Sequence, residues 1–126
     1  MLKGIDKALS AELVYVLMLM GHGGRSRHLR HQPPGSDHRQ KNTFGKLIDL
    51  TGCDIPRATT AILSLMTLDT FVDTPVMRMQ VVGNPNGIVP IFARMQQAVD
   101  AAEGRSRGFS SLASSTFDAF SYDIAA

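Results

Sequence analysis

The chain of 126 residues is 44% hydrophobic and 19% charged, and its formal net charge at pH 7 is +2. This composition is typical of one globular domain over residues 1–126 and excludes a largely disordered protein. The small net charge gives no support for a nucleic-acid partner, and the single cysteine, Cys53, excludes an internal disulfide. We expect a cytoplasmic protein without a membrane span, because the apolar run at residues 13–20 is too short to cross a bilayer.

The first predicted element is a helix that runs into a histidine between two glycines, Gly21-His22-Gly23. Ser10 is suited to cap the amino end of this helix, and Glu12 lies in the first turn, where a negative charge favours the helix dipole. Gly21 is expected to end the helix. The apolar residues at helical spacing are Leu13, Val14, Leu17 and Met20.

Residues 24–42 break this regularity. They contain a single large apolar residue, Leu29, together with two prolines and many arginines and histidines, without helical or strand periodicity. Because burial of arginine or histidine is costly, the sequence predicts an exposed loop here and no core strand.

The polar residues of this segment could bind a metal ion or contact phosphate groups, but the sequence lacks the further residues that either kind of site requires. His28, His31 and His38 match no standard metal-site spacing, so we expect no metal. The arginines could contact phosphates, but no recognition helix or aromatic platform accompanies them, so we expect no nucleic-acid partner. A basic-arm binding module remains an alternative function. Its arginines would be Arg25, Arg27 and Arg30.

Regular patterns return at Thr43. The apolar run at residues 47–50 predicts a short buried strand, and Pro56 lies near the start of a second helix. The alternation of apolar and polar residues predicts a further strand over residues 76–82.

A third helix is predicted to open at Pro90 and to end at Gly104. Residues 105–126 have too poor a period to be assigned to any element. The alternation of strands and helices along the chain predicts a single α/β domain with helices packed on a central sheet.

Several short blocks of the sequence are similar to blocks that a known family has in the same order. They are Met1-Leu2-Lys3-Gly4-Ile5, Leu9-Ser10-Ala11-Glu12-Leu13, Met20-Gly21-His22-Gly23, Asp54-Ile55-Pro56, Leu68-Asp69-Thr70-Phe71-Val72 and Pro75-Val76-Met77-Arg78-Met79. Together they resemble the D-ribose pyranase / L-fucose mutarotase family, and its fucose mutarotase branch more closely. The resemblance covers residues 1–23 and about 43–104.

The resemblance implies an isomerase, without metal or other cofactor, that interconverts the anomers of a monosaccharide such as L-fucose or D-ribose. In that reaction an acid protonates the ring oxygen while a base takes the proton of the anomeric hydroxyl. The histidine that carries the proton in the family corresponds here to His22. The family also implies a homo-oligomer with sites at subunit contacts.

Candidates for contacts with the substrate lie in the last of the resembling blocks. They are Met77, Arg78 and Met79, with burial in the core as the alternative for the two methionines. Asp69 is expected to cap a loop rather than to act as a catalytic acid.

Two segments depart from the family, residues 24–42 and 105–126. Relatives continue from Gly-His-Gly into an apolar strand that ends in an aspartate, and a final strand bearing Tyr-Gly-Asn closes their sugar site. We therefore expect a three-layer-like domain that lacks one inner strand and the C-terminal strand. A non-catalytic sugar-binding or interaction remnant of the family is then the alternative to an active mutarotase.

A frameshift is our hypothesis for both segments. One permitted back-translation of residues 24–35, with its first base dropped, encodes Val-Val-Arg-Gly-Ile-Tyr-Asp-Ile-Asn-His-Pro, an apolar strand followed by an acidic residue and a proline. Resequencing the gene across the codons for residues 23–43 tests the hypothesis. An uninterrupted frame that matches the present sequence at every base would contradict it.

Overall fold

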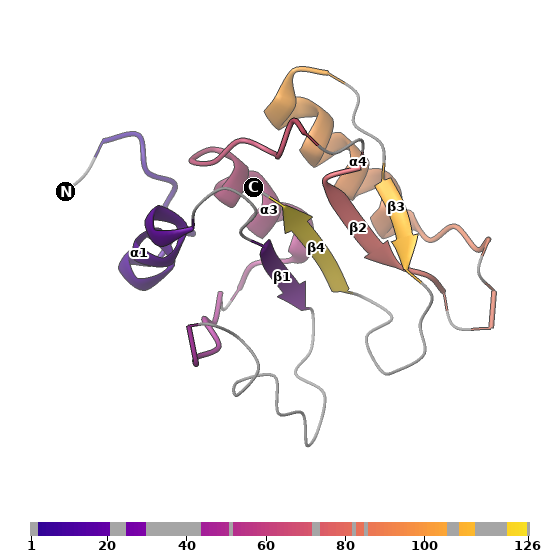
Figure 1. The fold of residues 1–126 in the computed structure, drawn as a ribbon, viewed down its shortest axis with the longest axis horizontal. Helices are drawn as coiled ribbons and strands as arrows, with labels where there is room; N and C mark the ends of the chain where they lie inside the picture. Colours follow the sequence, from indigo (N-terminus) through magenta and orange to yellow (C-terminus); the bar gives the residue numbers. More distant parts are fainter. Residues whose placement is uncertain are drawn as a thin grey trace.

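The computed structural model describes residues 3–20, 25–29, 44–50, 52–71, 74–81, 83–84, 86–105, 109–112 and 121–125. Its helices are α1 (Ala11–Leu19), α3 (Ile55–Leu63) and α4 (Pro90–Glu103). Its strands are β1 (Arg25–Leu29), β2 (Val76–Met79), β3 (Phe109–Leu112) and β4 (Ser121–Ala125). Together they form an α/β fold, as the sequence predicts (Figure 1).

The strands form one four-stranded sheet in the order β1-β4-β2-β3. Strand β4 runs antiparallel to β1 and to β2, whereas β3 runs parallel to β2. Strands β1, β2 and β3 therefore point in one direction, and β4 is reversed. The last strand of the chain thus lies inside the sheet, between β1 and β2.

The structure corrects two predictions about this sheet. Strand β1 lies in the segment where a loop is predicted, and β4 is the C-terminal strand that is predicted to be missing. As an edge strand, β1 needs a partner on one side only, and edge strands tolerate charged residues. The pairing of β4 with β2 joins segments far apart in the chain, and the periodicity of residues 105–126 carries no sign of it.

The apolar run at residues 47–50 is not a strand, contrary to the prediction. Ile48 and Leu50 are instead partly buried against the apolar cluster that joins α1 to α3. The apolar side chains of so short a run can be buried by packing alone, because burial does not require strand pairing.

Helices α3 and α4 lie on one face of the sheet. In the view of Figure 1, α3 and α4 lie side by side behind the strands, and α1 packs beside α3. Within the described ranges no helix covers the opposite face, so the described helices and strands form two layers.

The ends of the helices follow the sequence closely. The backbone N–H of Leu13 donates to Ser10 Oγ over 3.1 Å, which confirms Ser10 as the cap of α1. Helix α4 begins at Pro90 and ends at Gly104, whose φ of 66° is a left-handed conformation that glycine adopts without strain.

The core lies between the sheet and the helices. Val76 of β2 packs with Val99 of α4, and both are fully buried. Leu9 and Leu13 attach α1 to α3 through a second cluster. The third cluster contains Ile55, Phe92 and Met95.

Candidate functional site

The predicted proton carrier, His22, lies outside the described residues. Helix α1 ends at Leu19 with Met20 as its C-cap, and the description resumes at Arg25. His22 therefore belongs to the short connection between α1 and β1, and its predicted role stays a prediction.

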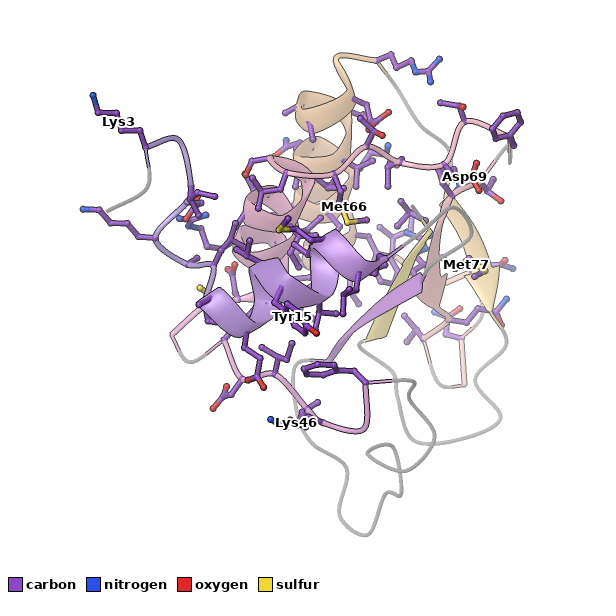
Figure 2. All side chains as sticks on the ribbon, turned by 60° about the vertical axis from the view of Figure 1, so that its left-hand side comes forward. Lys3, Tyr15, Lys46, Met66, Asp69 and Met77 are labelled. Carbon is purple, nitrogen blue, oxygen red and sulfur yellow. The ribbon has the colours of Figure 1, made fainter. Side chains whose placement is uncertain are left out.

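Strand β2 separates the predicted substrate contacts. Val76 and Arg78 are two residues apart and share the helix-covered face, since Val76 packs against Val99 and the Arg78 guanidinium lies 3.9 Å from the centre of the Phe92 ring of α4. Met77 belongs to the opposite face and is labelled in Figure 2. Of Met79 the structure describes the backbone only.

It follows that a ligand lying against one face of β2 meets either Met77 or Arg78. Both side chains are partly buried. The sequence alone does not show that Met77 and Arg78 lie on opposite faces, because this requires knowledge of the strand and of the face that is buried.

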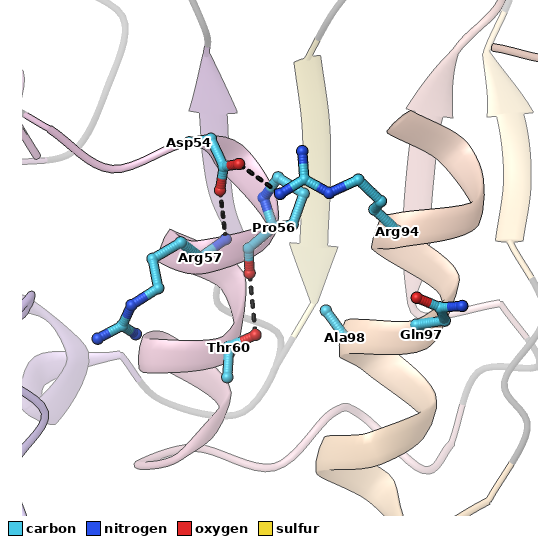
Figure 3. Close-up of a pocket in the computed structure, with 7 residues that line it drawn as sticks. All are labelled: Asp54, Pro56, Arg57, Thr60, Arg94, Gln97 and Ala98. Atoms are coloured by element: carbon cyan, nitrogen blue, oxygen red, sulfur yellow. Dashed lines mark hydrogen bonds and ion pairs between the residues drawn. The ribbon is translucent and has the colours of Figure 1, made fainter. Parts of the chain in front are cut away.

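A chain of ion pairs joins the N-terminal segment to α3 and α4. The Arg57 guanidinium binds the Asp6 carboxylate with two hydrogen bonds, of 2.8 Å from Nη1 and 2.5 Å from Nη2. Asp54 caps α3 by accepting from the Arg57 backbone N–H over 2.9 Å, and it also accepts from Arg94 Nη2 over 2.6 Å. Figure 3 shows Asp54 between the two arginines.

These contacts shift the pKa values of Asp6, Asp54 and Arg57. The hydrogen bonds from the Arg57 guanidinium, followed by one from the Ala8 N–H, hold the pKa of Asp6 below its ordinary value. The pKa of Asp54 is lowered first by the Arg57 backbone N–H and then by Arg94. The Asp6 carboxylate in turn raises the pKa of Arg57. All these groups are therefore charged at neutral pH, and none is suited to exchange a proton there.

An open pocket of about 380 Å³ lies over these residues, between α3 and α4 (Figure 3). Its charged members are already paired with one another or with Asp6, and it contains neither histidine nor cysteine. The arrangement holds the helices together and offers no proton carrier. The pocket is lined by Asp54, Pro56, Arg57, Thr60, Arg94, Gln97 and Ala98.

Asp69 has the loop-capping role expected of it. Its Oδ1 accepts from the backbone N–H of Phe71 over 2.8 Å, which fixes the turn after Leu68. Among the residues that the structure describes, no group of three metal-ligating side chains is assembled. In the same part of the chain, no helix is long and apolar enough to cross a membrane.

Sequence reasoning missed this network of ion pairs. The order Asp54-Ile55-Pro56 is itself a helix-start signal, with an acidic cap before a proline in the first turn, so Asp54 could have been found. The pair of Asp6 with Arg57 joins residues 51 positions apart, and nothing local in the sequence reports it.

Comparison with known sequences gives a family. Residues 3–122 match the RbsD / FucU transport protein family. The fucose mutarotase of Mus musculus is 40% identical over 81 residues, which are 64% of this chain and 52% of that protein. The L-fucose mutarotase of Haemophilus influenzae (strain 86-028NP) is 33% identical over 113 residues, 89% of this chain and 74% of that protein. The chain thus spans about half the length of the mouse relative.

Comparison with solved structures supports the fold. The structure of the protein Atu2016, a proposed sugar binding protein, matches with a TM-score of 0.85 and 30% identity, over 99% of this chain and 94% of that one. The fucose mutarotase of Streptococcus pneumoniae, solved in complex with L-fucose, matches with a TM-score of 0.70 and 24% identity, over 98% and 96% of the two chains.

Proposed function

The chain belongs to the RbsD / FucU transport protein family, and from this we propose that it is a mutarotase, which interconverts the anomers of L-fucose or D-ribose. The observation that carries the proposal is the identity of 31–40% with relatives named fucose mutarotase. The complex of the Streptococcus pneumoniae relative with L-fucose supports a monosaccharide as the ligand.

The reaction requires little from the protein other than proton transfer. One group protonates the ring oxygen while another removes the proton of the anomeric hydroxyl, and the open aldehyde then rotates and recloses. We assign the proton transfer to His22, because an imidazole has a pKa near neutrality. The chemistry requires no metal or nucleotide.

Met77 is our candidate for contact with the sugar. It is partly exposed on the face of the sheet that no described helix covers, where an apolar side chain can meet the C–H groups of a pyranose ring. Met79 follows on the same strand at the same alternation and is proposed to act with it.

A homo-oligomer is part of the proposal. Helix α1 is apolar on its outer side too, with Tyr15, Met18 and Leu19 exposed by 56%, 81% and 63%. A helix that is apolar all round is typical of a buried element, so a second subunit packed here would complete its burial. Leu19, the last residue of α1, precedes His22 by three positions in the chain, which supports a site near the subunit contact.

Sugar binding without catalysis is the second candidate. It is favoured by the resemblance to Atu2016, a proposed sugar binding protein. In this second candidate function, the protein binds the sugar but does not transfer a proton.

Exchange NMR of the anomers of L-fucose and D-ribose separates the two candidates. We expect the protein to accelerate anomer exchange over buffer alone, and His22→Gln to abolish the acceleration. His38→Gln is the matched control and should exchange anomers like the unaltered chain. Binding of sugar without any acceleration by the unaltered chain would select the second candidate.

A further inference from the structure

Helix α1 has no polar side. Of its nine residues, all within the described part of the chain, Glu12 alone is charged and Leu13 alone is buried. The residues that face outward are aromatic or apolar, namely Tyr15, Met18 and Leu19. A surface helix is normally kept from turning about its axis because its polar side must stay in water. In α1 this restraint is missing.

The apolar contacts of α1 attach it to α3 without favouring one rotation. Leu13, together with Leu9 just before the helix, packs with Ala61 and Ile62 of α3. A turn of the helix about its axis would bring another aliphatic side chain, such as Leu17, against α3 in place of Leu13. The hydrophobic effect is not directional, so it distinguishes poorly between such arrangements.

The start of α1 is held by directional contacts instead. The Asp6 carboxylate accepts from both Arg57 Nη atoms, and its Oδ1 also accepts from the Ala8 N–H. The Leu9 N–H donates to the Asp6 carbonyl over 3.0 Å, and Ser10, the next residue, caps α1. A continuous series of short hydrogen bonds therefore connects the carboxylate to the first turn of the helix.

Arg57 is itself firmly placed. It lies in the first turn of α3, where its backbone N–H donates to Asp54, and Asp54 is held in turn by Arg94 of α4. Figure 3 shows the Arg57 side chain pointing away from both of these residues. The Asp6 side chain is only 24% exposed in the pair. Two parallel hydrogen bonds between a guanidinium and a carboxylate fix geometry as well as distance.

The far end of α1 leads to the predicted proton carrier. His22 follows Leu19 by three positions, and three residues span at most about 11 Å of extended chain. The rotation of α1 therefore sets the point from which this chain starts. Proton transfer requires the acid or base within hydrogen-bond reach, and a misplacement of about 1 Å can cost about 100-fold in rate.

We propose that Asp6 and Arg57 are positioning residues for the mutarotase reaction. Their ion pair selects the rotation of α1, and with it the place from which His22 acts. The inference rests on the proposed function, in which His22 transfers the proton. The same rotation decides which apolar side of α1 is left for a second subunit.

Methionine-methyl NMR tests the rotation without reference to activity. Met18 lies on the outer side of α1, and Met66 packs against the cluster that joins α1 to α3. We expect both methyl signals to shift or split in Asp6→Asn and in Arg57→Gln. Arg94→Gln is the matched control, because it removes a similarly exposed arginine whose pair does not reach α1, and it should leave both signals in place. Unchanged signals in Asp6→Asn and Arg57→Gln would overturn the proposal.

Exchange NMR of the sugar anomers, below the Tm of every variant, tests the effect on the reaction. Asp6→Asn and Arg57→Gln should each lower kcat about tenfold with KM nearly unchanged, and the double variant should be no slower than the slower single one. Arg57→Lys, which keeps the charge, should lose less than Arg57→Gln. Arg94→Gln should exchange anomers like the unaltered chain.

The two measurements separate the possible failures. Normal exchange in Asp6→Asn and Arg57→Gln, or losses that add in the double variant, would overturn the positioning role even if the methyl signals move. If the unaltered chain does not accelerate exchange of either sugar, the proposed function fails, and the methyl signals alone then show whether the pair sets the rotation of α1.

Discussion

Arg57 and Asp6 are joined by two parallel hydrogen bonds across 51 residues of sequence. The same Asp6 carboxylate accepts from the backbone N–H of Ala8 over 2.9 Å, so it shapes the turn that leads into α1 while Arg57 holds it to α3. The pair of Asp6 with Arg57 therefore fixes the segment before α1 to α3.

Removal of this carboxylate should loosen the N-terminal segment without unfolding the domain. In Asp6→Asn we expect faster hydrogen exchange at the Ala8 and Leu9 amides and a small fall in Tm, because the pair lies in contact with solvent. Lys7→Gln, which changes an exposed neighbour, is the control. Unchanged exchange at Ala8 in Asp6→Asn would show that the pair does not hold the segment.

The two aspartates predict how stability depends on pH. Both have pKa values below the ordinary 3.8 in the folded chain, so their contribution is present above that value and is lost as pH falls through the lower folded values. We expect Tm to be nearly constant from neutral pH down to about 5 and to fall below about 4. In the double variant Asp6→Asn/Asp54→Asn the fall should be shallower. A variant with the same acid profile as the unaltered chain would assign the fall to other groups.

The cap of α3 should contribute measurably by itself. Asp54→Ala removes the acceptor for the Arg57 backbone N–H, and loss of such a cap costs about 0.5–2 kcal/mol of unfolding free energy. Urea unfolding measures the change. Asp54→Ser keeps a capping oxygen but loses the pair with Arg94, so it should recover most of the loss if the cap dominates. Equal losses in the two variants would mean that the pair with Arg94 dominates.

The sheet order predicts unequal effects of proline in two strands. Ile124 lies in β4, which pairs with β1 on one side and β2 on the other, so Ile124→Pro should prevent cooperative folding. Proline at Arg25, the first residue of an edge strand, should be tolerated far better. Circular dichroism melts of the two variants make the comparison. Similar melts would argue against a central position for β4.

The core contacts of α4 give a further prediction. Met95 is fully buried and packs with Ile55 and Phe92, so Met95→Ala should cost about 2–5 kcal/mol. Met18 is 81% exposed on α1, and Met18→Ala should change the unfolding free energy of the monomer by less than about 0.5 kcal/mol. Urea unfolding of each variant measures both values. A larger effect of Met18→Ala at high protein concentration than at low would indicate the self-association that we propose.

The sequence predicts those parts of the fold that depend on neighbours along the chain. Ser10, Pro90 and Gly104 act on the backbone next to them, and the helix ends they predict are confirmed. The segment around Arg25 could not be predicted, because its strand exists through pairing with residues 121–125. A local pattern cannot report such a partner.

The candidate site divides in the same way. The family was identified from short blocks of sequence, and the match over residues 3–122 confirms it. The separation of Met77 from Arg78 could not be derived from the block that contains both, because it depends on which face of β2 the helices cover. His22 keeps the role that the family implies as a prediction, and the frameshift hypothesis awaits the gene.

The place of β4 has a consequence for synthesis of the protein. Strand β1 is translated long before its register partners, from Ser121 to Ala125. Until then both β1 and β2 present an unpaired edge, and such edges invite pairing with other chains. The nascent protein is therefore exposed to aggregation until residues 121–125 have been translated, and loss of these residues would leave both edges unpaired permanently.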